Sequence, residues 1–329
     1  MMRLSLMKRV VDTVDEEWRS PLAFELMENW GYDVGEVYYW RASANFIFVC
    51  KRDGKTYFLR FNDGNERTIE EIESELNVIQ YLAEHSIRVA QPVKSKNDRY
   101  IETVQTELGT FHAVLFEEAV GEHLEFEELI EEQFFLWGSS LGELHEVLKK
   151  APVVLQDGRS SWSDHLDFAE RSLPQKDQAT RNEIHFLREW AKNLEKTEDN
   201  FGLIHYDFEL DNLKVKDHQI SILDFDDCAS YWYVADIVYA LRDAGEFDVH
   251  SPNIQKFMGG YRERTQLDDK LMEEAEGFSR MHRLLMYAKL IRTVDIEESA
   301  DHPEWLTNLR EKLVRKIEEY RQSLEVLQS

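Results

Sequence analysis

Cysteine is scarce in this chain of 329 residues, where Cys50 and Cys228 are the two that occur. Two cysteines can build neither a disulfide framework nor a cysteine-based zinc site, so we expect a protein of the reducing cytoplasm. Uncharged apolar runs of the roughly 18 residues that a membrane helix needs are also missing, which argues against a membrane span. The segment before Trp18 mixes Lys8 and Arg9 with acidic side chains, unlike a secretory signal peptide.

Positive charge is also in short supply. Lys and Arg number 39 against 65 Asp and Glu, which gives a formal net charge of −26. Such a surface repels nucleic acid and anionic membranes, so we expect neither as a partner. Two readings of the acidity stay open: it serves solubility alone, or it attracts a cationic small molecule to an acidic cleft.

Several catalytic signatures are missing as well. The chain has no G-x-G-x-x-G phosphate loop, no G-x-S-x-G nucleophile elbow and no H-E-x-x-H metal motif. The last two absences disfavour an α/β-hydrolase and a zincin. Hydrophobic residues nevertheless make up 43% of the chain, enough to bury a sizeable core.

The first third of the chain reads as helix and then sheet. Apolar spacing from Leu4 to about Trp30 is helical, and aromatic and β-branched runs follow it. Asp53-Gly54 is a favoured hairpin pair, and a helix with one apolar face is expected over residues 68–84. The expected strands cover residues 37–40, 45–50, 56–61, 100–105 and 111–116.

Beyond a break at Gly121 the chain is expected to be mostly helical. The expected helices cover residues 127–149, 163–171 and 180–195, with three long helices from 253 to the end. Only two short strands, near 213–215 and 219–223, interrupt them. We therefore predict an α+β protein with a small sheet-plus-helix lobe and a larger helical lobe. The predicted units are a helical extension (1–34), a small lobe (35–116), a hinge (117–121) and a helical lobe (122–329).

The main candidates for catalytic residues are Asp207, Asn212 and Asp224. Asp207 and Asn212 are five residues apart, as in the kinase catalytic loop H-R-D-x-x-x-x-N, and Asp224 follows twelve residues later, after a short hairpin. Phosphoryl transfer needs one carboxylate at the acceptor hydroxyl, and an amide oxygen and a second carboxylate on Mg²⁺. Each residue alone is also a common turn residue, but their joint spacing favours a phosphotransferase site.

The segment from His205 to Asp226 resembles that of the aminoglycoside phosphotransferase and choline kinase family, a small-molecule branch of the protein-kinase-like fold. Leu141-Gly142-Glu143-Leu144-His145 is similar to the family's L-G-x-L-H element, and residues 116–121 resemble its lobe hinge. Asp236 resembles the aspartate that leads the helix after the second motif. The resemblance implies a two-lobed kinase-like fold, with ATP and Mg²⁺ as cofactors.

In the large lobe, the resemblance implies that Asp207 is the catalytic base or hydroxyl-orienting group and that Asn212 and Asp224 bind Mg²⁺. His205 would support the loop by hydrogen bonding. Asp226 stands where protein kinases have glycine, and three roles stay open for it: assisting the metal, meeting a cationic substrate, or capping a turn.

In the small lobe, the resemblance implies that a strand lysine contacts the α- and β-phosphates, but here that position is Arg60. Glu75, on the core-facing side of the following helix, is the candidate partner of Arg60. Ser43 and neighbouring backbone N–H groups are candidates for phosphate contact, although an ordinary turn is the alternative. At the hinge, the Glu117 carbonyl and the Ala119 N–H would face adenine.

The resulting function is transfer of the γ-phosphoryl group of ATP to a hydroxyl of a small molecule, as in aminoglycoside, choline, ethanolamine, homoserine and methylthioribose kinases. An acidic cluster favours a cationic, amine-bearing acceptor. Its members are Glu209, Asp211, Asp226 and Asp227. Two alternatives remain: a nucleotide-binding pseudokinase, prompted by Arg60, and a protein serine/threonine kinase, which the absence of an A-P-E element disfavours.

Overall fold

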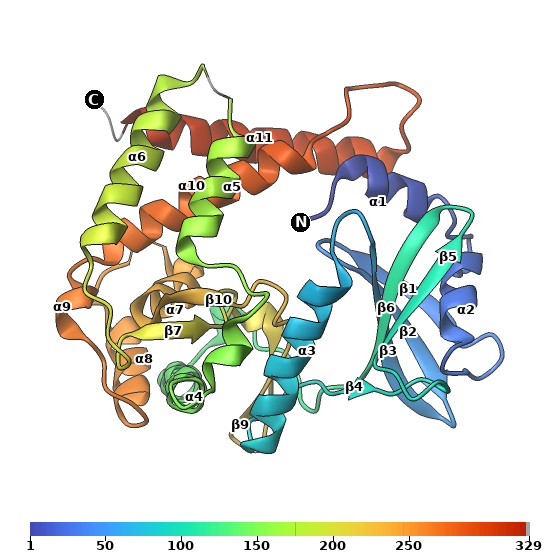
Figure 1. The fold of residues 1–329 in the computed structure, drawn as a ribbon, viewed down its shortest axis with the longest axis horizontal. Helices are drawn as coiled ribbons and strands as arrows, with labels where there is room; N and C mark the ends of the chain where they lie inside the picture. The colour runs from blue at the N-terminus through green and yellow to red at the C-terminus, as the bar shows by residue number, and fades with distance from the viewer. Residues whose placement is uncertain (175, 246, 327–329) are drawn as a thin grey trace.

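The computed structural model describes residues 1–174, 176–245 and 247–326. Figure 1 shows a sheet lobe on one side of the molecule and a larger helical lobe on the other. The sheet has the order β1-β2-β3-β6-β4, and β5 pairs with β6. Its strands are β1 (Val37–Ala42), β2 (Phe46–Arg52), β3 (Lys55–Asp63), β4 (Pro92–Val93), β5 (Ile101–Thr106) and β6 (Gly109–Glu117).

The hairpin between β2 and β3 controls which way Arg60 points. Asp53 and Gly54 both have positive φ, 53° and 72°, the backbone that a two-residue hairpin turn of the favoured type requires. The resulting register pairs Ile47 with Arg60. Leu59 and Phe61, on either side of Arg60, are fully buried in the apolar cluster of the small lobe. Because side chains alternate along a strand, Arg60 projects from the opposite face.

Helices α1 (Leu4–Val11) and α2 (Pro21–Met27) cover one face of this sheet and share its apolar core. The helical spacing predicted through to Trp30 is correct for both helices but misses the break between them. Pro21 has no N–H and begins the second helix, where that group is not needed. Leu306 of the long C-terminal helix is buried in the same cluster.

Helix α3 (Ile69–Glu84) carries Glu75 and begins as a capping box. The Thr68 side chain accepts from the Glu71 N–H, and the Glu71 carboxylate accepts from the Thr68 N–H. Ile72 and Ile79 are buried on the face that packs into the core, and Glu75 lies on that face with no exposed surface. The predicted orientation of Glu75 is confirmed.

The larger lobe is mainly helical, and its predicted long helices lie within a few residues of their expected positions. Helix α7 is buried along its whole length, which removes the amphipathic period that reveals a surface helix. The helices are α4 (Glu131–Leu148), α5 (Trp162–Ser172), α6 (Gln178–Asn193), α7 (Tyr233–Ala240), α8 (Pro252–Arg262), α9 (Asp269–Met272), α10 (Ala275–Thr293) and α11 (Glu304–Val326).

The expectation of only two strands in this lobe is wrong. The predicted hairpin is present as β8 (Leu213–Lys216) and β9 (Gln219–Ile222), but β7 (Phe201–Ile204) and β10 (Ala229–Trp232) form a second antiparallel pair. Both additional strands are short and almost wholly buried, so they lack the polar–apolar alternation that identifies a half-exposed strand. Within the described residues, no helix is long and apolar enough to cross a membrane.

Candidate active site

The loop between β7 and β8 carries His205, Asp207 and Asn212, and a buried carboxylate holds its beginning. The two oxygens of Asp236 accept the backbone N–H groups of His205 and Tyr206, each at 2.8 Å. His145 Nε2 lies 2.9 Å from the same carboxylate. His205 Nε2 in turn lies 2.9 Å from the Leu223 carbonyl, next to Asp224. His205 therefore links the two predicted catalytic segments, as expected of a supporting residue.

The structure brings Asp207 and Asn212 into direct contact. The side-chain amide of Asn212 donates to Asp207 Oδ2 at 2.9 Å and to the Asp207 carbonyl at 3.0 Å. The amide nitrogen of Asn212 thus faces Asp207, which leaves the amide oxygen of Asn212 to face elsewhere. That oxygen is the atom that a hard cation would use.

Asp224 lies two residues after the end of β9 and has a φ of +58°, a backbone conformation that Asp tolerates better than most residues. Its Oδ1 is buried without a hydrogen-bond partner among the described residues, and Arg60 Nη1 is 3.7 Å away. Burial, and next the charge of Asp226, raise the pKa of the Asp224 carboxyl to about 7. A buried carboxylate oxygen with no donor is costly unless something else binds it.

These groups fit a magnesium ion. Mg²⁺ takes oxygen ligands and keeps several waters, so proteins hold it with one or two carboxylates together with substrate phosphates. The carboxylate of Asp224 and the amide oxygen of Asn212 are donors of that kind. Among the described residues, no group of three or more His, Cys, Asp or Glu side chains is arranged to cage a metal. The site therefore suits a metal that arrives with phosphate.

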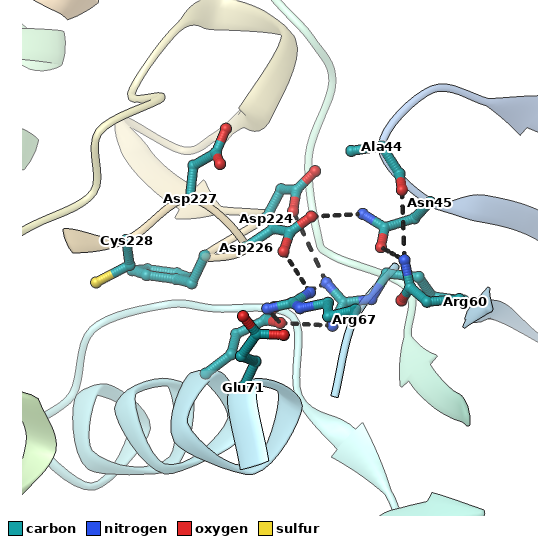
Figure 2. Close-up of polar contacts among 12 residues, drawn as sticks. Ala44, Asn45, Arg60, Arg67, Glu71, Asp224, Asp226, Asp227 and Cys228 are labelled. Carbon is teal, nitrogen blue, oxygen red and sulfur yellow. Dashed lines mark hydrogen bonds and ion pairs between the residues drawn. The ribbon is translucent and has the colours of Figure 1, made fainter. Parts of the chain in front are cut away.

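Arg60 and Glu75 form the predicted pair, which belongs to a larger network. Glu75 also accepts from Arg67, with Nη2 to Oε2 at 2.9 Å, and Arg67 pairs with Asp226. The Asn45 amide donates to the other oxygen of Asp226 at 3.1 Å. Figure 2 shows Asp224 and Asp226 turned toward these groups, while the Asp227 carboxylate points away.

The charges in this network are compensated within a buried site. Arg60 and Arg67 together lower the pKa of Glu75 to about 2 against the opposing effect of burial, so the carboxylate stays ionised. Arg67 was not predicted as a site residue. Arg67 directly precedes the helix cap Thr68 and belongs to no sequence motif. Its role becomes visible only in the folded structure, where it pairs with Asp226.

A cleft of about 470 Å³ lies between the lobes beside this network. Five of the predicted site residues line this cleft: Arg60, Glu75, Glu117, Ala119 and Asp224. The lining also includes apolar side chains of both lobes, Ile47, Val49, Phe116 and Ile222 among them. Apolar walls with a polar end suit a nucleotide base and its phosphates.

Ser43 does not line this cleft. Its N–H donates to the Asn45 carbonyl at 3.1 Å, and its carbonyl accepts from the Met2 N–H at 3.0 Å. The backbone of Ser43 is therefore engaged within the turn between β1 and β2. Trp40 and Arg41 of β1 line the cleft instead.

The hinge ends at a position that requires glycine. Gly121 has a φ of +122°, and a Cβ there would lie 2.8 Å from backbone atoms of Val215. The next residue, Glu122, exchanges two backbone hydrogen bonds with Val215. Close backbone approach thus joins the hinge to β8, beside the catalytic loop.

Three members of the acidic cluster are neutralised by cations of this chain. Arg242, from the turn after α7, donates to Asp207 Oδ1 at 2.8 Å and also to Glu209. Asp226 pairs with Arg67, as above, and Asp227 pairs with Lys289 at 2.7 Å. Arg242 was not predicted, since no spacing rule connects it to a loop more than thirty residues earlier.

The fold and these groups define a two-lobed protein of the kinase-like class. The family model described as "Phosphotransferase enzyme family" matches residues 41–271, well over half of the chain. The chain belongs to this family, and the resemblance seen in the sequence is confirmed. It is an enzyme class that transfers phosphoryl groups, which confirms the predicted activity at that level.

Individual kinases are also similar to this chain in sequence or in fold. Amicoumacin kinase of Bacillus subtilis (strain 168) is 25% identical over 284 residues, 83% of this chain and 84% of that protein. A solved amicoumacin kinase in complex with AMP-PNP, Ca²⁺ and Ami has a TM-score of 0.78 at 22% identity, covering 97% of this chain and 95% of that one. A microcompartment-associated aminopropanol kinase has a TM-score of 0.69 at 23% identity, covering 92% and 96%. These structures confirm the predicted fold class.

Proposed function

We propose that this chain transfers the γ-phosphoryl group of ATP, with Mg²⁺, to a hydroxyl of a small molecule. The observations that carry the proposal are the contact between Asn212 and Asp207 and the buried Oδ1 of Asp224, which lines the interlobe cleft and has no hydrogen-bond partner among the described residues. An amicoumacin kinase of the same fold is known in complex with AMP-PNP and Ca²⁺, which supports a nucleotide with a divalent metal.

The roles follow from what each group can reach. Asn212 and Asp224 would hold Mg²⁺, which neutralises charge on the β- and γ-phosphates. Arg60, fixed by Glu75, would place positive charge beside the phosphates, and the backbone at Glu117 and Ala119 would face adenine. Ser43 stays a prediction for phosphate contact.

Asp207 would orient the acceptor hydroxyl and receive its proton. The acceptor oxygen forms a bond to the γ-phosphorus while the bond from that phosphorus to the bridging oxygen breaks, so ADP leaves. Asp207 is already held by Asn212 on one oxygen and by Arg242 on the other. A carboxylate oxygen has two lone pairs, so Oδ1 can still accept from a hydroxyl.

An amine-bearing acceptor belongs to this proposal. A microcompartment-associated aminopropanol kinase has a similar fold, which supports an acceptor with an amine and a hydroxyl. Because Glu209, Asp226 and Asp227 already have cationic partners, an acceptor ammonium would have to share Glu209 with Arg242 or bind at Asp211.

The test is a thermal shift with ATP and Mg²⁺. A ligand that binds only the native state raises the melting temperature, so Mg²⁺-ATP should stabilise the protein. In Asp224→Ala most of the increment should vanish, whereas Asp301→Ala, at an exposed carboxylate outside the cleft lining, should keep it. An unchanged shift in Asp224→Ala would remove Asp224 from the metal site.

A nucleotide-binding pseudokinase is the second candidate, favoured by one observation: an arginine occupies the position of the phosphate-binding lysine. ADP formation distinguishes the two. A panel of amino alcohols, aminoglycosides and sugars should yield acceptor-dependent ADP if the chain is a kinase. Mg²⁺-ATP stabilisation without turnover on any acceptor would favour the pseudokinase.

A further inference from the structure

A single cation holds the turn that follows Asp224. The carbonyls of Phe225, Asp226 and Cys228 all accept from the Arg159 guanidinium. Nε reaches the Cys228 oxygen at 2.8 Å, and Nη2 reaches the oxygens of Phe225 and Asp226 at 2.9 and 2.5 Å. Hydrogen bonds from a charged donor are stronger than neutral ones. Carbonyl oxygens that converge on one point repel one another, so the cation between them stabilises this conformation of the turn.

The segment that carries Arg159 is itself attached to helix α3. It lies between α4 and α5, and its Asp157 carbonyl accepts from Ser74 Oγ at 2.7 Å. Nη1 of Arg159 reaches the Glu71 carbonyl of the same helix at 3.4 Å. Ser74 directly precedes Glu75, the partner of the strand arginine. Residues 157–160 therefore bridge α3 and the turn after Asp224.

The position of Asp224 depends on the backbone that this bridge holds. Asp224 Oδ1 is buried without a hydrogen-bond partner among the described residues, and Arg60 Nη1 is 3.7 Å away. The φ of +58° at Asp224 is sparsely populated by residues other than glycine, and such a conformation persists only where its surroundings constrain it. Arg159 supplies a constraint through backbone carbonyls alone, so no sequence motif indicates its role.

We propose that Arg159 is a positioning residue for the metal: it holds the turn at residues 225–228 so that the Asp224 carboxylate stays where Mg²⁺ binds. Because residues 157–160 are bonded to α3, the position of Asp224 is coupled to the helix that carries Glu75. The inference rests on the proposed function and adds to it a residue that touches neither nucleotide nor metal. Groups that orient a metal ligand in this way typically contribute roughly 10- to 100-fold to metal affinity.

The first test uses the two cysteines of the metal-free protein. Cys228 is 1% exposed and Cys50 is fully buried, and burial raises the pKa of both thiols to about 12, so both should react slowly with a disulfide reagent. In Arg159→Ala the turn opens locally, so Cys228 should react at least about tenfold faster while the rate at Cys50 stays unchanged. Equal acceleration at both cysteines, or none at Cys228, would overturn the inference.

The second test separates the metal from the nucleotide. Calorimetry measures the affinity for AMP-PNP with and without Mg²⁺. Arg159→Ala should lose at least about tenfold of the affinity measured with Mg²⁺ and keep the metal-free affinity within about threefold. A wild type without any gain from Mg²⁺ would overturn the proposed function together with this inference. A normal gain in Arg159→Ala, or equal losses with and without Mg²⁺, would overturn the inference alone.

Two further variants control for folding and for the loss of an arginine. Arg159→Lys keeps the charge but not the fork, so it should lie between the wild type and Arg159→Ala in both tests, and it replaces Arg159→Ala if that variant does not fold. Arg188 of α6 is a half-buried arginine that pairs with Asp167 and Glu170, outside the cleft lining. Arg188→Ala should leave both readouts unchanged, and an effect equal to that of Arg159→Ala would overturn the inference.

Chemical rescue tests whether the cation itself holds the turn. Arg159 lines a polar cavity of about 190 Å³, so a small cation can enter the space that Arg159→Ala leaves. Guanidinium at low millimolar concentration should restore part of the Mg²⁺-dependent affinity of Arg159→Ala, whereas urea, which has a similar shape and no charge, should not. Equal effects of guanidinium and urea would overturn the inference.

Ser74→Ala tests the connection to α3. Removing the hydroxyl that binds the Asp157 carbonyl should raise the labelling rate at Cys228 roughly two- to fivefold in the wild type and should add little in Arg159→Ala, because residues of one network are not additive. An unchanged rate in Ser74→Ala, or the same factor in both backgrounds, would overturn the coupling between α3 and the turn.

Discussion

Arg60 and Glu75 meet fork to fork: Nη1 donates to Oε1 at 2.7 Å and Nη2 donates to Oε2 at 2.8 Å. This pair joins β3 to α3 at the end of the nucleotide cleft. A lysine in the same place would be a single point charge, whereas the planar guanidinium fixes its own orientation against the carboxylate. Glu75 thus holds the Arg60 guanidinium in one orientation with two hydrogen bonds.

The first prediction concerns this pair. Arg60→Ala should lower kcat/KM by at least about tenfold, equivalent to about 1.4 kcal/mol, because positive charge beside the phosphates is lost. Arg60→Lys should retain more activity. Glu75→Gln should resemble Arg60→Ala in direction, and the double variant should cost less than the sum of the two, as contacting residues do. Steady-state kinetics of all four variants measure the coupling, and strict additivity would contradict it.

Glu75→Ala should behave differently from Glu75→Gln, because Glu75 also holds Arg67. Removing the carboxylate leaves two buried guanidinium groups without their shared partner, which costs roughly 3–5 kcal/mol in comparable cases. Urea denaturation should therefore show a large loss for Glu75→Ala. A loss confined to activity would mean that Arg67 relies on Asp226 alone.

The second prediction follows from the pKa of about 7 at Asp224. Mg²⁺ binds the ionised carboxylate, so affinity for Mg²⁺-nucleotide should rise with pH up to about 7 and level off above it. In the metal-free protein the sign is opposite. The folded state keeps a proton that the unfolded chain releases near pH 4, so this group lowers stability as pH rises from about 4 to 7.

Asp224→Asn should remove both effects. Its metal-free form should be more stable than the wild type at pH 8, and its weak nucleotide binding should not change across pH 7. Titrations from pH 5.5 to 8.5, with thermal shift and calorimetry, measure the two together. A wild-type affinity that is flat across this range would contradict the raised pKa.

The third prediction separates Asp207 from nucleotide binding. Asp207→Asn should keep ATP affinity within a few-fold while turnover falls by roughly 10² or more, the scale of general-base loss. Asp207 accepts from both Asn212 and Arg242, so an Asn here can accept only with its single oxygen. Asp207→Ala should therefore be measured beside it. Near wild-type turnover in either variant would remove Asp207 from the acceptor side.

The fourth prediction concerns Asp236, which the structure places beneath the catalytic loop. Asp236→Ala leaves the N–H groups of His205 and Tyr206 and the His145 ring without their shared acceptor. Unsatisfied buried donors cost about 1–3 kcal/mol each, so the free energy of unfolding should fall by at least about 3 kcal/mol. Urea denaturation measures it, with Asp301→Ala as control. Equal stability of the two variants would mean that the loop does not depend on this carboxylate.

Local sequence was sufficient for much of the fold. The Asp53-Gly54 turn and the strands on both sides of it follow from residues that are neighbours in the chain, and so does the face of α3 that carries Glu75. Strands β7 and β10 were not recognisable, because buried strands lose the alternation that marks them. Helix α7 is also buried on all sides and has no amphipathic period, so only the resemblance at Asp236 indicated it.

The candidate site also contains residues that local sequence predicts and residues that it does not. Spacing along the chain identified Asp207, Asn212 and Asp224, since a short loop and a tight hairpin keep these groups together whatever surrounds them. The sequence did not predict Arg67 and Arg242 as site residues, although each contacts a predicted acidic residue. The partners of Arg67 and Arg242 lie far away in the sequence, and a local pattern does not predict which distant carboxylate will pair with a cationic side chain.

The sequence by itself therefore determined the two-lobed kinase-like class, the position of the proposed phosphotransfer residues and the orientation of Arg60 and Glu75, because these depend on short-range backbone geometry. Only the tertiary structure decided how the acidic cluster is neutralised and what lines the interlobe cleft. Buried charges must be paired, and the pairing is chosen by which segments pack together. Arg242 reaches Asp207 because α7 packs beneath the catalytic loop, where the Asp236 carboxylate accepts from the backbone N–H of His205.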